Sequence, residues 1–385
     1  MKKLDYIDGL KGIGALMVFF CHFVFAFYYA AYSLTEDAVN TASGIEIAIG
    51  KTPLNLLYSG NAAVCLFLVF SGFVLCLSYF HTKDKKRLKS AAWKRYFRLM
   101  PMILLSNTAI FLLMSWGLYR NSEAAVLTGS TVWFAGFNQF QPDFLQMLGE
   151  SLAGCFLFGT NNYNGVLWTI PYLFSGALVV YLAAYLVGEN PFRYVAYAVM
   201  ILMAVKTDIY FAGVFLGFAA SDFFCTQKKG MELWERFWLL PLGSFVLGVY
   251  LLSYPSIGSD MSGTVYGLLP SAYTTLYHMA GAVLLLAGVL GLPELQRFFG
   301  AKPFRFLGKV SYSLYLLHFP VIATFSCWLF LGLYGKMSYG ILVGLNFLCT
   351  FGLVLVLSEL SNRYLEPVSG WLTGKLSGFF TGKTR

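Results

Sequence analysis

His22 ends an apolar run, "KGIGALMVFFCH" at residues 11–22, that has the composition of a membrane helix. With Lys11 at one membrane surface, His22 lies about three helical turns further along, near mid-bilayer. An ionisable side chain at that depth is costly unless it is paired or functional. A neutral imidazole is a good general base near neutral pH, so the position predicts proton transfer. The alternative is a structural histidine bonded to a neighbouring helix.

A second polar stripe lies in "GKVSYSLYLLHFP" at residues 308–320. Ser311, Tyr315 and His318 fall at i, i+4 and i+7, which places them on one face of a helix. Such a stripe serves either as hydrogen-bonding glue between membrane helices or as the wall of a polar cavity. The residues alone leave both readings open.

Two further motifs stand at opposite ends of predicted helices. In "WKRYFRLMP" (93–101), Arg95 and Arg98 share a helix face at its cytoplasmic mouth and form a two-pronged anion site, unless they are ordinary cytoplasmic charges. In "NGVLWTIP" (164–171), Asn164 and Trp168 stand at the outer end of a helix. Trp168 is either part of a substrate site or an anchor at the membrane interface.

The composition says which elements must position these residues. Hydrophobic residues make up 58% of the 385, charged residues only 12%, and the mean hydropathy is +0.66. Soluble domains carry roughly 25% charged residues, so we predict an all-α, polytopic membrane bundle. About ten transmembrane helices are expected, at 10–31, 58–80, 99–118, 167–187, 192–206, 208–225, 236–253, 273–291, 311–332 and 338–361. Residues 144–158 are too short to span, and 194–224 are interpreted as two helices.

The charges predict the orientation. Most of the 27 Lys and Arg residues fall in alternate connecting segments, which by the positive-inside rule places both termini in the cytoplasm. The net charge of +9 therefore reflects the membrane topology and not nucleic-acid binding. The seven cysteines show no metal-ligand spacing, and no metal is expected. We predict one transmembrane domain over 1–370, a short basic cytoplasmic tail over 371–385, and a multi-pass location in the cell (cytoplasmic) membrane.

The chain resembles the family-three membrane acyltransferases in six stretches that follow the family's order. They are "YIDGLKGIGALMVFFCH", "CLFLVFSGFVLCLSYF" (65–80), "WKRYFRLMP", "GVLWTIP", "FLGKVSYSLYLLHFPVI" (306–322) and "RYLEP" (363–367). Two departures stand out. Lys11 replaces the arginine that precedes the family's histidine, which keeps the charge but loses the bidentate fork. After "WTIP", Tyr172 and Leu173 stand where the family carries an acid.

The resemblance implies O-acyl transfer, most simply of acetyl, from cytoplasmic acyl-CoA to an extracytoplasmic hydroxyl such as that of a surface polysaccharide or lipid-linked sugar. Lys11, Arg95 and Arg98 would bind CoA phosphates, with no tightly bound cofactor. His22 would act as general base or carry an acyl-imidazole.

The remaining assignments concern the acceptor side of the same site. Ser311, Tyr315 or His318 would bond the oxyanion, and Asn164 and Trp168 would contact the acceptor, gated by the 120–166 loop. The alternative class is a transporter or flippase of a lipid-linked sugar that uses the same polar cavity.

Overall fold

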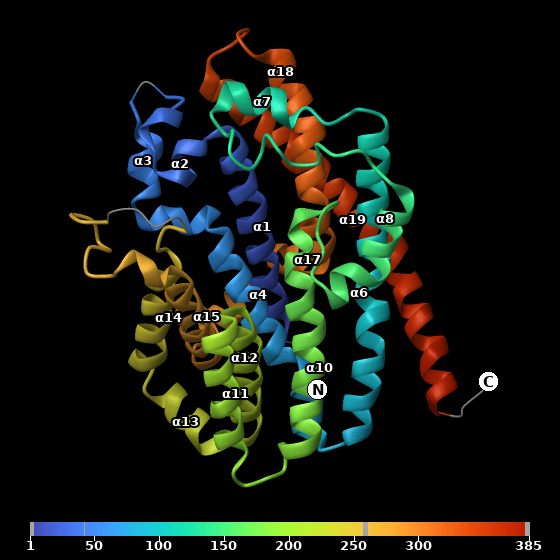
Figure 1. Cartoon of the computed structure of the whole chain (residues 1–385). Coiled ribbons are helices and arrows are strands. Elements are labelled where there is room, and N and C mark those ends of the chain that lie inside the picture. Colours follow the sequence, from blue (N-terminus) through green and yellow to red (C-terminus); the bar gives the residue numbers. More distant parts are fainter. Residues whose placement is uncertain (1–3, 42, 257–260, 382–385) are drawn as a thin grey trace.

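A computed structural model describes residues 4–41, 43–256 and 261–381, with the side chains of those up to 375. Within these residues all regular structure is helical, and the helices are arranged as a bundle (Figure 1). The all-α prediction is therefore confirmed.

Eight helical segments of the described chain are long and apolar enough to cross a membrane. They are α1 (Asp5–Phe27), α4 with α5 (Gly60–Leu75, Leu77–Thr82), α6 (Lys85–Ser115), η4 with α10 (Gly165–Thr169, Ile170–Val187), α12 (Ile209–Thr226), η5 with α15 (Ser271–Tyr273, Thr274–Gly291), α17 with η6 and α18 (Lys302–Val321, Ile322–Ser326, Cys327–Leu333) and α19 (Tyr339–Thr381). A ninth span results if α13 (Lys228–Arg236) and α14 (Leu239–Leu252), bent by 84°, count as one.

The other helices are short and mostly join these spans. They are α2 (Tyr29–Ser33), η1 (Glu36–Ala38), α3 (Ile45–Gly50), η2 (Pro53–Tyr58), α7 (Asn121–Thr128), α8 (Phe144–Gly149), η3 (Glu150–Gly154), α9 (Cys155–Leu157), α11 (Arg193–Thr207) and α16 (Pro293–Phe299). Helices α2, α3, α7 and α18 lie together at the upper end of Figure 1.

Helices occur at all ten predicted positions, but several boundaries differ. Helix α11 has 15 residues, about 22 Å of helix, and so falls short of a ~30 Å bilayer core. The division of 194–224 into two helices is confirmed, because Asp208 caps α12 through a 3.0 Å bond from the Tyr210 N–H. Residues 144–157 form a short apolar helix, as expected.

The largest boundary errors concern the charged ends of spans. Helix α6 begins at Lys85, not at residue 99, because Asp84 caps it by accepting the Lys86 N–H at 3.0 Å. Helix α19 continues to Thr381, past both 361 and 370. Ser369 donates to the Phe97 carbonyl of α6 at 2.9 Å, so this extension packs against the bundle. Hydropathy missed both extensions because it detects the apolar part of a helix, not the helix itself.

The helix pair α1 and α17 forms the centre of the bundle. A Cβ on Gly12 would lie only 2.5 Å from the Gly308 backbone nitrogen, so only glycine permits this approach. The same number of residues separates Gly12 from His22 as separates Gly308 from His318. Since the two helices run in the same direction, their equal rise brings both histidines to the same level.

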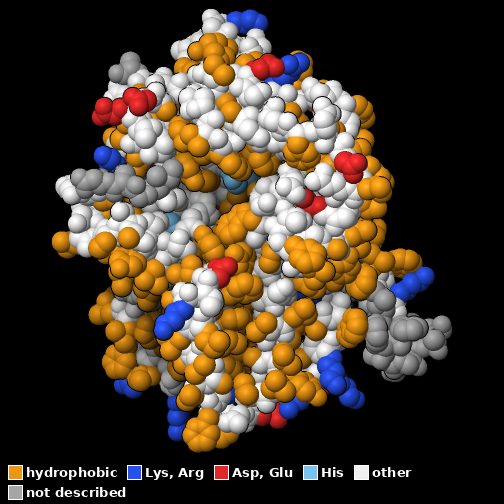
Figure 2. Space-filling model, in the orientation of Figure 1, with side chains coloured by type: hydrophobic (Ala, Val, Ile, Leu, Met, Phe, Trp, Pro, Cys, Tyr) orange, Lys and Arg blue, Asp and Glu red, His pale blue; other side chains and the backbone are white. Residues whose placement is uncertain are grey.

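The outer surface agrees with a membrane protein. Figure 2 shows hydrophobic side chains over much of the middle and lower part of one face, with Lys and Arg side chains along the lower edge. Exposed large apolar residues on the spanning helices include Leu182, Val246 and Leu348. Apolar surface of this extent is what a lipid-facing bundle presents.

Candidate active site

His22 and His318 form a hydrogen-bonded pair between α1 and α17. His22 Nδ1 lies 2.8 Å from His318 Nε2, and His318 Nδ1 lies 3.1 Å from the Leu314 carbonyl oxygen. A carbonyl only accepts, so His318 carries its proton on Nδ1 and, when neutral, accepts at Nε2. His22 must then donate from Nδ1, which leaves its Nε2 with a free lone pair. The second histidine thus selects the tautomer of the first.

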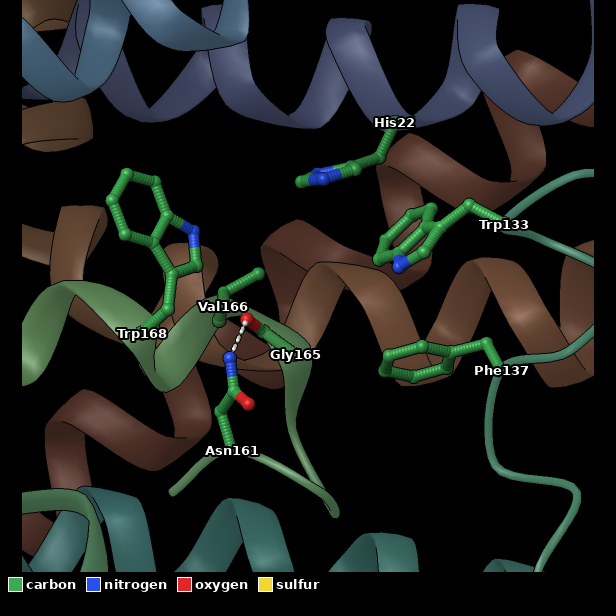
Figure 3. A pocket seen from close by; sticks show the side chains of 7 residues that line it. All are labelled: His22, Trp133, Phe137, Asn161, Gly165, Val166 and Trp168. Carbon is green, nitrogen blue, oxygen red and sulfur yellow. Dashed lines mark hydrogen bonds between the residues drawn. The ribbon is translucent and has the colours of Figure 1, made fainter. Parts of the chain in front are cut away.

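His22 projects into a cavity of about 370 Å³. Figure 3 shows its ring between Trp168 on one side and Trp133 with Phe137 on the other, with Asn161 across the cavity. The cavity is lined by His22, Trp133, Phe137, Asn161, Gly165, Val166 and Trp168. His22 is partly exposed, whereas His318 is fully buried behind it. A substrate therefore meets His22 and not His318.

The loop between α7 and α8 supplies the wall that sequence reasoning missed. The Trp133 ring centroid lies 5.7 Å from that of His22 and 5.0 Å from that of Phe319, and Phe137 packs on Phe319 at 4.2 Å. We predicted only that the 120–166 loop would gate the acceptor. The signal was available, because "VWFAGFNQF" places several aromatic rings in a connecting segment where hydropathy predicts no helix.

Asn164 shapes the opposite wall and does not line the cavity. It is fully buried, its Nδ2 donates to the Leu316 carbonyl at 2.9 Å, and its Oδ1 accepts the Val166 N–H at 3.4 Å. Its amide thus caps η4 and ties that turn to α17. Asn161 lines the cavity instead, with its Nδ2 bonded to the Gly165 carbonyl at 3.2 Å (Figure 3).

The buried carboxylate of Glu150 binds the backbone of the segment that contains Asn161 and Asn164. Glu150 is 4% exposed and accepts the backbone N–H groups of Asn162 and Tyr163, each at 3.0 Å. It also accepts the Asn162 side-chain amide at 3.0 Å. These bonds fix the turn from which Asn161, Gly165 and Trp168 reach the cavity.

The predicted oxyanion donors are already engaged with protein groups. Ser311 donates to the Gly308 carbonyl at 2.9 Å, and the Tyr315 hydroxyl lies 2.9 Å from the Val166 carbonyl and 3.0 Å from Thr169 Oγ1. Neither residue lines the cavity. By contrast, the indole nitrogen of Trp168 has no hydrogen-bond partner among the described residues, and Figure 3 shows it on the side of the ring nearer His22.

The arginines lie at a lower level of the bundle and apart from this cavity. Because α6 begins at Lys85, Arg95 sits inside the helix and not at its mouth. Its Nε donates to the Leu173 carbonyl at 2.9 Å, and its NH2 lies 3.4 Å from Ser71 Oγ. Arg98 is exposed, and Lys11 on α1 is partly exposed. Neither the His22 cavity nor the cavity lined by Val132, Phe140 and Asn162 includes any of these three cations in its lining.

The His22 cavity and Arg95 are linked through the segment that follows Trp168. Trp168 lines the His22 cavity, and Leu173, which Arg95 contacts, follows it by little more than one helical turn, about 8 Å. Tyr315 bridges α17 to η4 between these levels through its bonds to Val166 and Thr169. In the described residues, no group of three His, Cys, Asp or Glu side chains is placed to hold a metal ion.

Comparisons with known proteins give the family of the chain. A family model described as an acyltransferase domain matches residues 4–360. Acyltransferase clz18 of Cochliobolus lunatus is 24% identical, with 94% of each chain covered. O-acetyltransferase PaAT-1 of Phomopsis amygdali is 24% identical over 98% of this chain and 86% of its own. Acyltransferase MdmB of Streptomyces mycarofaciens is 26% identical over 83% and 79%.

No solved structure matches the chain. The family match covers almost the whole length, and it includes α1, η4 and α17, which carry the histidine pair and the cavity. The chain is thus an O-acyltransferase, a multi-pass membrane protein that belongs to acyltransferase family 3.

Proposed function

We propose that the protein transfers an acyl group, most simply acetyl, from cytoplasmic acyl-CoA to a hydroxyl of an extracytoplasmic sugar in a cell-surface polysaccharide. The observation that carries this proposal is the His22–His318 pair, which leaves His22 Nε2 unprotonated and facing a cavity of about 370 Å³. A general base within reach of a substrate hydroxyl is what O-acyl transfer needs.

The reaction follows from the tautomer. The acceptor hydroxyl gives its proton to His22 Nε2 while its oxygen attacks the thioester carbonyl carbon. The His22 cation that forms is stabilised because its Nδ1–H already points at the His318 Nε2 lone pair. The tetrahedral intermediate then collapses, the C–S bond breaks, and the proton passes from His22 to the departing CoA sulfur. The products are the ester and CoA thiol.

We assign oxyanion stabilisation to Trp168 in place of Ser311, Tyr315 and His318. An oxyanion donor must have a proton that is free to point at the developing charge. The protons of Ser311 and His318 point at backbone carbonyls, and the Tyr315 hydroxyl is held between Val166 and Thr169. The indole N–H of Trp168 faces the cavity without such a partner.

The donor side is completed by the cations of the lower level. CoA carries a diphosphate and a ribose phosphate, and exposed Arg98 with Arg95 and Lys11 supplies the charge to bind them. The acyl-pantetheine arm must then pass the Tyr315 bridge to reach His22. We infer that binding of acyl-CoA opens the bonds from Tyr315 to Val166 and Thr169.

A reconstituted assay tests this function. Purified protein in detergent is incubated with acetyl-CoA and sugar acceptors, and free CoA and acetylated sugar are both measured. We expect equal amounts of the two products, and about 10³-fold slower formation of both with His22→Ala. CoA-independent movement of sugar across vesicles, without ester formation, would contradict the proposal. The cell's own acceptor is identified by comparing surface glycans, by mass and NMR, from cells with and without the gene.

A further inference from the structure

A second cavity, of about 320 Å³, adjoins the one that contains His22. Trp133 and Phe137 line both cavities and so form a wall that the two cavities share. The second is lined by Val132, Trp133, Gly136, Phe137, Asn138, Phe140 and Asn162. The transfer reaction described above uses only the first, so the second has no assigned occupant.

Its lining is suited to a ring that carries hydroxyl groups. Trp133 and Phe140 are 39% and 36% exposed and line this cavity, so their rings are accessible to a ligand. Aromatic faces carry partial negative charge and attract the C–H edge of a pyranose. The amides of Asn138 and Asn162 add polar groups to the same lining, which is the usual composition of a small-molecule site.

Asn138 is a largely buried residue of this lining. It is 8% exposed, its Nδ2 donates to the Tyr163 carbonyl at 3.0 Å, and its Oδ1 has no hydrogen-bond partner among the described residues. Its backbone also adopts φ of 52°, which few residues other than glycine accept. Because the Oδ1 atom is itself covered by protein, Asn138 shapes this part of the wall and does not offer an acceptor to a ligand.

We propose that the second cavity binds the sugar ring next to the one that is acylated. The acceptor is therefore at least two linked rings long, and a monosaccharide fills only half of the site. This inference rests on the proposed function, because it places the reacting hydroxyl at His22. The occupant follows from the shared wall: a molecule that touches His22 and extends past Trp133 and Phe137 enters the second cavity.

Gly136 offers a way to fill this cavity alone. A Cβ built on it has no neighbour nearer than the Trp133 carbonyl oxygen at 4.0 Å, so a larger side chain has room. Gly136 does not line the first cavity. A graded series, Gly136→Ala, Gly136→Leu and Gly136→Phe, therefore blocks the second cavity stepwise. The matched control is Gly332→Phe. Gly332 is an exposed residue of α18, and a Cβ built on it meets nothing within 4 Å.

The experiment compares single rings with pairs of rings. Acetyl transfer is measured to the methyl glycosides of glucose, galactose and N-acetylglucosamine, and to cellobiose, lactose and diacetylchitobiose. We expect wild-type protein to prefer a disaccharide by about tenfold or more in kcat/KM. Gly136→Phe should remove that preference through a higher KM, while transfer to single rings and the Gly332→Phe protein are unchanged.

Four results would each contradict a part of this proposal. Equal wild-type rates with one and two rings, or disaccharide transfer unaffected by Gly136→Phe, would overturn the second subsite and leave the proposed function in place. Equal loss of both activities in Gly136→Phe, with Gly136→Leu behaving the same way, would show that the loop is structural. Transfer to none of these sugars would instead contradict the sugar acceptor, and the subsite with it.

Discussion

The His22 cavity draws on side chains from four separate segments of the chain, whereas Arg95 and Arg98 come from one helix and have different surroundings. His22, His318, Trp133 and Trp168 derive from α1, α17, the α7–α8 loop and η4. Arg95 is bonded to the Leu173 carbonyl, and Arg98 is exposed. The acceptor end of the proposed reaction is thus preorganised, while the donor end forms only when an anion binds. Preorganisation lowers the barrier where the bonds change.

His22→Ala is the most direct way to break this comparison. Loss of the general base should lower kcat by about 10³-fold, since general bases contribute roughly 10²–10⁴-fold. CoA release and ester formation should fall together, with melting temperature little changed, because His22 is only partly buried. Retained activity in His22→Ala would assign the chemistry to another group. Trapping of an acyl-protein on wild type would favour the acyl-imidazole route.

Trp168→Phe removes the indole N–H and keeps an aromatic ring at this position. The ring remains, so acceptor binding should persist, but kcat should fall by about 100-fold, the typical effect of one oxyanion donor. Steady-state kinetics with a saturating sugar acceptor measure this change. A rise in acceptor KM with kcat unchanged would make Trp168 a stacking surface only.

Variants of His318 test whether the tautomer of His22 affects the rate of transfer. His318→Leu removes the acceptor for the His22 Nδ1–H and should lower kcat by up to about 100-fold, the lower end of a general base's contribution. His318→Gln retains an acceptor oxygen and a donor for the Leu314 carbonyl, so it should recover part of the rate. Equal losses in Leu and Gln variants would instead indicate a packing role.

The arginines should affect binding and not chemistry. Arg98→Ala should raise the KM for acetyl-CoA about tenfold, the value of one charge-assisted bond, with kcat unchanged. Arg95→Ala should in addition lower the melting temperature, because it leaves the Leu173 carbonyl without its donor. Rising salt should weaken acetyl-CoA binding in wild type more than in either variant. An unchanged KM for acetyl-CoA in both variants would show that these arginines do not bind the CoA phosphates.

Tyr315→Phe should have the smallest effect. It removes the bonds to Val166 and Thr169, which are worth about 1 kcal/mol each in stability. If these bonds close the passage to the arginines, the variant should lower the KM for acetyl-CoA by a few-fold while kcat stays within a factor of about two. Urea unfolding and acetyl-CoA titration measure the two quantities. A raised KM would show that Tyr315 contacts the donor.

Hydropathy and charge were enough to predict an all-α bundle with helices at ten positions, because both are properties of a single segment. They also singled out His22 and His318 as ionisable residues at membrane depth, and Trp168 as an amphipathic residue at the outer end of a helix. They misplaced the start of α6 and the end of α19, where charged residues remain helical. The two errors have a common cause, because the prediction treated a helix as ending where its apolar residues end.

The pairing of His22 with His318 could not be predicted, because it depends on glycine contacts between helices 296 positions apart in the chain. It could also not be predicted that Ser311, Tyr315 and Asn164 do not line the cavity. Whether a hydroxyl or amide is free depends on the neighbouring groups that it bonds. Trp133 and the second cavity belong to a loop whose course is set by contacts with the rest of the chain, such as packing on Phe319 and the bond from Asn138 to Tyr163. A segment's own residues determine whether it is helical, but the partners of its side chains come from the rest of the chain.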